Sequence, residues 1–167
     1  MSHYIETENS THSTGVSAKL TEHPYFEAMR EWCSEQGFVP EEHTTFWNNQ
    51  ILMQFVFEDE EKNVFDVFFR LYEVEEIYFW IAVSAGKVEP KQLDKLVGEL
   101  NCLSECARTL YRVGLDSNNR VLVSLRGPAS VLNLYTFKKL IADPVEKAVM
   151  LRQVLVYEGF SVVNKGE

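Results

Sequence analysis

Three observations predict an α+β fold in two layers, with a mainly antiparallel five-stranded sheet and helices packed on one of its faces. Strand-length segments of alternating polarity are joined by short links, which require antiparallel neighbours. Segments with apolar residues at helical spacing precede, separate and follow these strands, in the order α-β-β-β-α-β-β-α. The chain of 167 residues is 46 % hydrophobic, which is enough to form one core.

The ends of the chain differ in composition from its middle. Residues 1–20 are rich in Ser, Thr, Glu and His and contain few large apolar side chains. This composition predicts a disordered N-terminal tail, or a segment that becomes ordered on a partner. Residues 21–160 are predicted to form a single α+β domain, and residues 161–167 a C-terminal tail.

Two helices are predicted before and within the sheet. The first runs from Pro24 to Gln36, with Gly37 just past its end, and the second runs from near Pro90 to Ala107. Apolar residues recur at helical spacing in both, so each is expected to direct one face to the core. In the first helix this stripe comprises Tyr25, Met29, Trp32 and Cys33.

The strands form a three-stranded meander and, later, a hairpin. Turn-forming residues from Ser117 to Asn119 join the two strands of the hairpin. Phe46 and Trp47 are expected to add a short leading strand. The five main strands are predicted at Ile51–Glu58, Val64–Glu73, Ile77–Ser84, Thr109–Asp116 and Arg120–Gly127.

The C-terminal part is predicted to be helical from Val131 to Ala142 and from Val145 to Glu158. Asp143 and Pro144 lie between these segments. Proline lacks a backbone donor and restricts the residue before it, so this pair either separates two helices or kinks one.

Side chains alternate between the two faces of a strand, so each predicted strand divides into two sets. The first set is wholly apolar and is expected to lie beneath the helices. It comprises Phe65, Val67, Phe69, Leu71, Ile77, Phe79, Ile81, Val83, Val121, Val123 and Leu125.

The second set mixes aromatic and charged residues. It comprises Asp66, Phe68, Arg70, Tyr72, Tyr78, Trp80, Ala82, Ser84, Arg120, Leu122, Ser124 and Arg126. A large aromatic patch in water is typical of an interaction surface, so Phe68, Tyr72, Tyr78 and Trp80 are predicted to bind a partner. The alternatives are that the C-terminal helices, or the leading strand, cover these rings. Whether the partner is a client protein or a second copy of the chain stays open.

The charge balance argues against polyanionic partners. The chain has 16 Lys and Arg against 25 Asp and Glu, for a net charge of −9. Such a field repels nucleic acid and anionic membranes, and neither is predicted as a partner. The candidates for a local basic patch are Arg70, Arg112, Arg120 and Arg126.

The three cysteines and the N-terminus predict a cytoplasmic protein. The chain opens Met-Ser-His-Tyr, without the charged and apolar regions of a signal peptide. Its apolar runs are strand-length and far shorter than a spanning helix. An odd number of cysteines in this context predicts free thiols.

Motifs for catalysis or for metal and cofactor binding are not found. Cys102 and Cys106 are four residues apart but have no partnering pair, so buried thiols are favoured over a zinc site. The eight glycines are scattered and form no phosphate loop. The acidic run from Glu58 to Glu61 lacks the spacing of a calcium loop. No catalytic residue, metal or cofactor is predicted, although a site built from distant positions would be invisible in sequence.

The order of elements across about residues 24–160 resembles the fold shared by type III secretion chaperones and YbjN-like proteins. The stretches that match are Glu99 to Asn101, Thr109 to Asp116, and Arg120 to Leu125 with the closing helix. The resemblance implies a small, acidic, often homodimeric cytoplasmic protein without enzymatic activity. Such proteins shelter an unfolded segment of a secreted client or take part in regulation. The interruption at Asp143 and Pro144 departs from a single uninterrupted last helix.

The predicted function is therefore that of a non-enzymatic protein-binding module. The alternative is a small-ligand or lipid-binding α+β domain, in which the sheet closes over an apolar cavity. An enzyme is the third class, and nothing in the sequence favours it.

Overall fold

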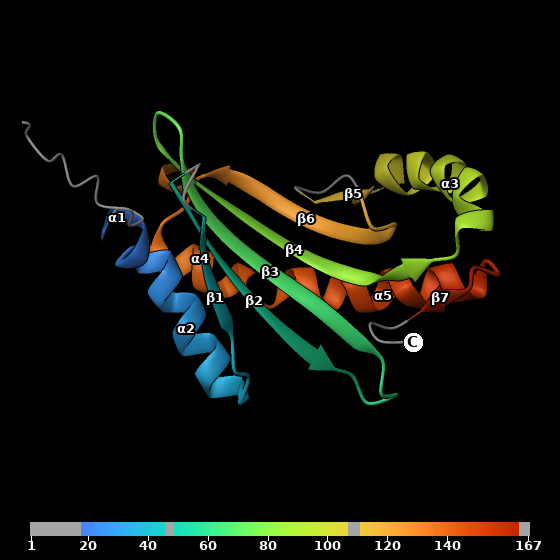
Figure 1. Cartoon of the computed structure of the whole chain (residues 1–167), viewed down its shortest axis with the longest axis horizontal. Coiled ribbons are helices and arrows are strands. Elements are labelled where there is room, and N and C mark those ends of the chain that lie inside the picture. Colours follow the sequence, from blue (N-terminus) through green and yellow to red (C-terminus); the bar gives the residue numbers. More distant parts are fainter. Residues whose placement is uncertain (1–17, 46–48, 107–110, 164–167) are drawn as a thin grey trace, which may run out of the picture.

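The computed structural model describes residues 18–45, 49–106 and 111–163. These residues form an α+β fold with one mainly antiparallel, open sheet and helices packed against it (Figure 1). The helices are α1 (Ala18–Thr21), α2 (Pro24–Gln36), α3 (Leu93–Cys106), α4 (Leu134–Leu140) and α5 (Asp143–Tyr157), with 3₁₀ turns at Pro90–Gln92 and Ala129–Val131. The strands are β1 (Glu41–Thr45), β2 (Gln50–Glu58), β3 (Val64–Glu73), β4 (Ile77–Val88), β5 (Arg112–Leu115), β6 (Arg120–Pro128) and β7 (Val162–Val163).

The sheet has seven strands, so the prediction of five was wrong. Six lie in the order β1-β2-β3-β4-β6-β5, and β7 pairs with the end of β4. β1 has the sequence Glu-Glu-His-Thr-Thr, which lacks the apolar alternation by which a strand is recognised. β7 contains two residues and lies in the segment predicted to be the C-terminal tail. The expected leading strand at Phe46 and Trp47 lies outside the described residues.

The helix boundaries follow from local chemistry. The His23 ring nitrogen accepts a hydrogen bond from the Tyr25 amide at the start of α2, and Gly37 ends this helix with φ 76°. α4 begins at Leu134 rather than at Val131, because the Asn133 side chain caps the Thr136 amide. Pro144 lies in the first turn of α5, so the interruption separates two helices.

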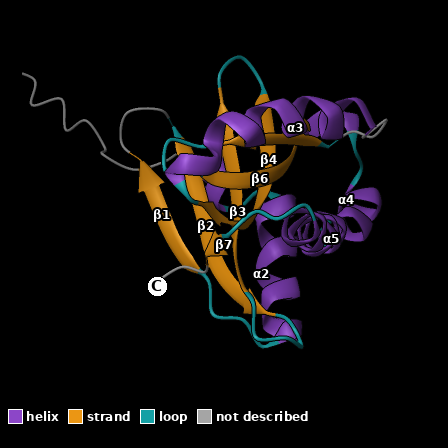
Figure 2. Ribbon diagram, turned by 90° about the vertical axis from the view of Figure 1, so that its right-hand side faces the viewer, coloured by secondary structure: helices purple, strands orange, loops and turns teal. Residues whose placement is uncertain are grey.

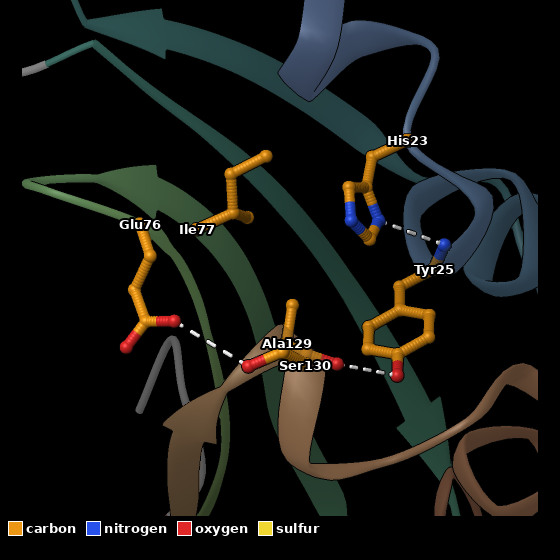
Figure 3. A pocket seen from close by; sticks show the side chains of 6 residues that line it. All are labelled: His23, Tyr25, Glu76, Ile77, Ala129 and Ser130. Carbon is orange, nitrogen blue, oxygen red and sulfur yellow. Dashed lines mark hydrogen bonds between the residues drawn. The ribbon is translucent and has the colours of Figure 1, made fainter.

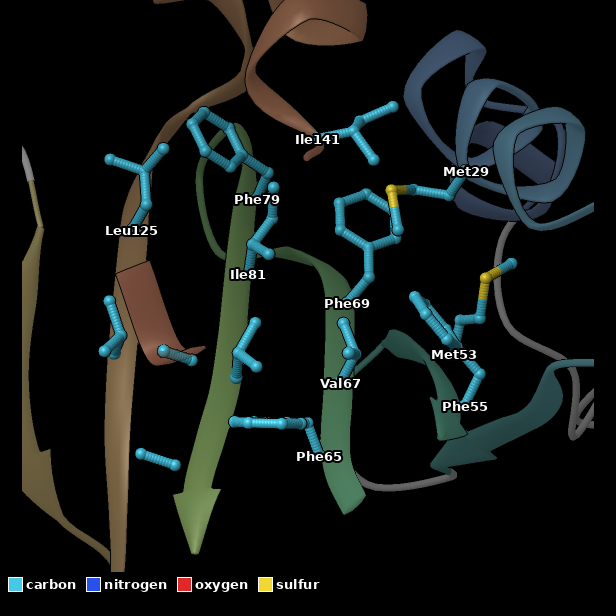
Figure 4. Close-up of a cluster of buried hydrophobic side chains, with 14 of the residues drawn as sticks. Met29, Met53, Phe55, Phe65, Val67, Phe69, Phe79, Ile81, Leu125 and Ile141 are labelled. Carbon is cyan, nitrogen blue, oxygen red and sulfur yellow. The ribbon is translucent and has the colours of Figure 1, made fainter. Parts of the chain in front are cut away.

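One face of the sheet is sealed by α2, α4 and α5. Figure 2 shows these helices on the same side of the strands, and α5 crosses β4 and β6. Phe69 lies between Phe26 of α2 and Phe137 of α4, with ring centroids 6.0 and 5.6 Å away. Every residue of the predicted apolar set is buried except Ile77, which is half-buried (Figure 4). The prediction of the helix-covered face is thus confirmed.

α3 closes one end of this layer. Leu96 and Leu100 enter the same core, and Lys95 lies over the Phe160 ring at 4.8 Å. Tyr111, just before β5, donates a hydrogen bond of 2.9 Å to Asp143 at the start of α5. These contacts tie the β5 end of the sheet to the helices. The side chains of Cys102 and Cys106, and residue Ala107, lie outside the described part.

Candidate partner-binding face of the sheet

The helices α2, α4 and α5 lie on one side of the sheet (Figures 1 and 2), and strand alternation assigns a second set of residues to the opposite side. Strand register brings the residues predicted for this side into shared rows, and β2 adds Gln50, Leu52 and Gln54 to them. We call this surface the aromatic face. Its members are Gln50, Leu52, Gln54, Asp66, Phe68, Arg70, Tyr72, Tyr78, Trp80, Ala82, Ser84, Arg120, Leu122, Ser124 and Arg126.

The rings of the aromatic face contact one another across β3 and β4. Tyr72 is paired with Tyr78, and their rings stack at 5.5 Å between centroids. Trp80 lies in the next row, with its ring 6.4 Å from that of Phe68. Cross-strand aromatic pairs stabilise a sheet and also hold the rings in fixed positions. The surface presented by these rings is therefore preorganised.

The rings differ in exposure. Tyr72, Tyr78 and Trp80 are half-buried, whereas Phe68 is only 8 % exposed. Phe68 does not belong to the main core; the Arg120 guanidinium lies over its ring at 5.0 Å. Phe68 thus supports the surface from beneath. Phe68 is therefore the least accessible of the four residues predicted to bind a partner.

Two groups at the edges of the aromatic face, Asp116 and Tyr78, have shifted pKa values. Arg120 Nε donates to Asp116 Oδ2 at 2.6 Å. Burial alone would raise the pKa of Asp116, but hydrogen bonds from the Arg120 backbone and side chain lower it. Burial, followed by the charge of Glu76, raises the pKa of Tyr78, so its phenol stays protonated at neutral pH.

A β-bulge extends the aromatic face in a way that alternation alone does not predict. The register of β4 against β6 shifts between Ser84 and Lys87, and Lys87 pairs with Arg120. Gly86 lies within the bulge with φ 121°. Lys87 therefore joins the side of the sheet that contains Arg120, although simple alternation from Ile77 places it on the helix-covered face.

A hollow of about 360 Å³ lies outside the aromatic face, at one end of the sheet (Figure 3). It brings together His23, Glu76 and Ser130, a combination that can suggest nucleophilic catalysis. The Ser130 hydroxyl is bonded to Glu76 at 3.4 Å, on the side of the hollow away from His23. His23 Nδ1 accepts the Tyr25 amide, so in the neutral ring the proton is on Nε2. Among the described hydrogen bonds, none joins the His23 ring to the Ser130 hydroxyl.

A second hollow, of about 390 Å³, lies between the β2–β3 turn and α5. Asp59 and Glu61 line one side, and Arg152, Val156 and Tyr157 line the other. Arg152 is buried, and its guanidinium donates to the carbonyl oxygens of Ala85 and Val162. These bonds give Arg152 a structural role in joining α5 to β4 and β7.

The other reactive side chains of the described part lie in unsuitable places. Cys33 of α2 is fully buried, and burial raises its pKa to about 11, so it is a poor nucleophile. His43 is exposed on edge strand β1, with Nε2 3.6 Å from Glu41. Within the described ranges, no group of three His, Cys, Asp or Glu side chains could hold a metal ion. No helix there is long and apolar enough to cross a membrane.

Comparisons with known proteins give a likeness in fold. No family model matches the sequence, and no curated protein matches it. YbjN from E. coli superposes with a TM-score of 0.50 at 12 % identity, covering 83 % of this chain and 95 % of YbjN. A chain of the ExsC–ExsE complex gives a TM-score of 0.48 at 14 % identity, covering 77 % of this chain and 91 % of its own. The likeness to YbjN therefore supports the predicted resemblance, for the fold alone.

Proposed function

We propose that this chain is a non-enzymatic protein-binding module, cytoplasmic and homodimeric, whose aromatic face receives a protein partner. The observation behind the proposal is the half-buried cluster of Tyr72, Tyr78 and Trp80, on the side of the sheet opposite α2, α4 and α5. Aromatic rings left partly in water keep apolar area to bury on association. Tyr, Trp and Arg are also the residue types most enriched at binding hot spots.

The shape of this face suits an extended segment. Its rings and the arginines between them follow rows that cross β3, β4 and β6. A segment laid on such rows can place alternate side chains against the rings. In a secretion chaperone this segment would belong to a client, and in a regulator of the YbjN kind to the protein that is regulated. A second copy of the chain is the other occupant that fits the proposal.

The small-ligand alternative has weaker support. The space between the sheet and the helices is filled by large side chains such as Phe65, Phe69 and Phe79 (Figure 4). The two hollows lined by described residues lie at the margins of the fold, and their volumes are at the small end of the range for ligand sites. The aromatic face, in contrast, is a broad surface.

The test is the double substitution Tyr78→Ser with Trp80→Ser. Random peptides of about 10 residues, long enough to follow one strand of the face, are displayed and selected on the wild-type protein. Fluorescence anisotropy then measures the affinity of the selected peptides for each variant. We expect the double variant to lose at least about tenfold in affinity, which corresponds to about 1.4 kcal/mol.

The matched control is Tyr157→Ser, because this tyrosine is 88 % exposed on α5, away from the sheet. It should bind the selected peptides as the wild type does. Circular dichroism and thermal melting establish that each variant is folded. A wild-type dimer that dissociates in the double variant would also support the proposal, with a second copy as occupant. Selected peptides that bind both variants with wild-type affinity would overturn it.

A further inference from the structure

The arginines of this acidic chain are not evenly distributed. Arg70, Arg120 and Arg126 lie on the aromatic face, and Arg112 joins them because it pairs with Ser124 of that face. All four candidates for a basic patch thus gather on one side of the sheet, in a chain with a net charge of −9. Lys87, placed beside Arg120 by the bulge, adds a fifth positive charge.

Three of these arginines differ from the others in having no carboxylate partner among the described residues. Arg30 is paired with Glu27 and Glu42, and Arg120 with Asp116. No ion pair of the described residues includes Arg70, Arg112 or Arg126. In a chain with surplus acid, arginines on one surface that have no carboxylate partner within the described part are suited to a partner supplied from outside.

The geometry places two of these charges on either side of one ring. Trp80 is paired with Arg70 on β3 and with Arg126 on β6. The Arg70 guanidinium lies over the Trp80 ring, 4.7 Å from its centroid. A guanidinium in that position keeps the donors in its plane free, and their forked spacing matches a carboxylate. Strands are about 4.8 Å apart, so the two arginine Cα atoms are separated by about 10 Å.

The carboxylates on the same side are poor partners for these arginines. Asp66 is only 5 % exposed, and Glu58 is bonded to Lys62 at 2.8 Å. Glu41 lies on the edge strand β1, two strands from Arg70. The exposed part of the aromatic face therefore has a local positive charge.

We infer that the partner of the aromatic face is an extended acidic protein segment, in which Asp or Glu side chains pair with Arg70 and Arg126 and neighbouring apolar side chains pack on Trp80 and Tyr78. This inference rests on the proposed function and specifies the chemistry of its partner. Arginine–carboxylate pairs beside aromatic rings combine directional bonds with apolar burial. Such a pair is also strengthened when the segment excludes water.

The acidic turns at both ends of β3 favour a protein segment over nucleic acid. Glu75 and Glu76 are exposed at one end of this strand, and Glu60 and Glu61 at the other. A nucleic acid has a phosphate at every nucleotide, so a strand crossing the face would bring phosphates close to these carboxylates. A protein segment can place its few carboxylates at the arginines and neutral residues elsewhere.

The experiment compares three sets of peptides that alternate apolar residues with a second class. The second class is Asp and Glu in the first set, Ser and Asn in the second, and Lys and Arg in the third. Anisotropy measures binding to the wild type, to Arg70→Gln with Arg126→Gln, and to Lys139→Gln with Lys147→Gln. The lysine variant is the matched control, since it removes the same charge from α4 and α5.

We expect the acidic set to bind the wild type at least about tenfold more tightly than the neutral set. The arginine variant should lose that preference, and the lysine variant should keep it. The affinity for acidic peptides should also fall between about 50 and about 300 mM salt, as screening increases. Arg126→Glu should shift the preference towards the basic set, a gain that an unfolded protein cannot produce.

Two results would overturn the inference. If neutral peptides bind as tightly as acidic ones and the arginine variant binds normally, the acidic partner is wrong while the proposed function stands. If an oligothymidine strand binds more tightly than any acidic peptide and its binding requires Arg70 and Arg126, the partner is a nucleic acid. Failure of all three peptide sets to bind would instead count against the proposed function itself.

Discussion

Phe68 and Phe69 are adjacent on β3 and both are buried, but different parts of the molecule bury them. Phe69 lies on the helix-covered face, fully enclosed between Phe26 and Phe137. Phe68 lies on the aromatic face, where Trp80 and the Arg120 guanidinium shield it. One ring is covered by helices, and the other by side chains of the sheet itself.

Side chains can thus be buried in two ways, beneath packed helices or beneath neighbouring side chains of the sheet. The helix-covered face is closed by backbone elements that cannot leave without unfolding the protein. The aromatic face is closed by side chains of the sheet's own strands, which leave Tyr72, Tyr78 and Trp80 partly exposed. A partner can therefore use the apolar area of the aromatic face at little cost to the fold, whereas the helix-covered face is available only in the unfolded chain.

Substitution of the two rings by alanine should give the largest difference between the faces. Phe69→Ala leaves a cavity between rigid elements and should lower the free energy of unfolding by about 3–5 kcal/mol. Phe68→Ala should cost about 2 kcal/mol, because Trp80 and Arg120 can settle into the space. Urea unfolding at neutral pH measures both. Equal losses would mean that the aromatic face is an ordinary core.

The alternation of residues in β3 and β4 made the two faces predictable, because a period of two assigns each side chain to a side. What covers a face is not encoded in that period. Phe68 is partly buried by Arg120. Arg120 comes close to Phe68 only because β6 pairs with β4. The sequence therefore indicated which rings share a surface but not that one of them lies beneath the others.

The features missed from sequence have related causes. β1 is polar, since an edge strand needs no apolar alternation, and β7 is too short to produce a pattern. Arg70, Arg112 and Arg126 form no ion pair with another described residue, and this is a property of the assembled surface. The composition indicated an acidic chain. It could not show the local positive charge on the aromatic face, because that charge depends on which residues the strand pairing brings together.

A second test concerns the bulge at Gly86, where the alternation of side chains along β4 changes. A Cβ at this position would collide with Val162 of β7 and lie 2.8 Å from Nη1 of Arg152, and φ is 121°. Gly86→Ala should therefore lower the free energy of unfolding by about 1–3 kcal/mol. It should also release β7, which hydrogen exchange at Val162 and Val163 would detect.

Gly114→Ala is the matched control for this test. Gly114 lies on edge strand β5, opposite Leu122 of the aromatic face, and a Cβ there would meet no atom within 4 Å. Its stability should change by less than about 0.5 kcal/mol, as is usual for a surface substitution. If Gly86→Ala is equally neutral, the contacts with Val162 and Arg152 do not require glycine at position 86.

Thiol labelling compares the accessibility of the two faces of the sheet directly. It is also the test with the smallest expected effect on stability. Cys33 of α2 is buried between this helix and the sheet, with Sγ 4.0 Å from Met53 Sδ, whereas Tyr78→Cys would place a thiol on the aromatic face. With Cys102 and Cys106 replaced by serine, iodoacetamide should label residue 78 at least about a hundredfold faster than Cys33 at pH 8, because only local opening exposes Cys33. Comparable rates would contradict the sealed layer.

The pH dependence of the same thiol gives the sign of its contribution to stability. Burial raises the pKa of Cys33 from 9.0 to about 11 in the folded protein. The unfolded chain therefore loses this proton first, and the stability linked to Cys33 is complete below pH 9 and falls as the pH rises through 11. Cys33→Ala should flatten that part of the alkaline unfolding curve, whereas Tyr78→Phe, on the half-open aromatic face, should leave the part due to Cys33 in place. An unchanged curve for Cys33→Ala would mean that water already reaches the thiol in the folded state.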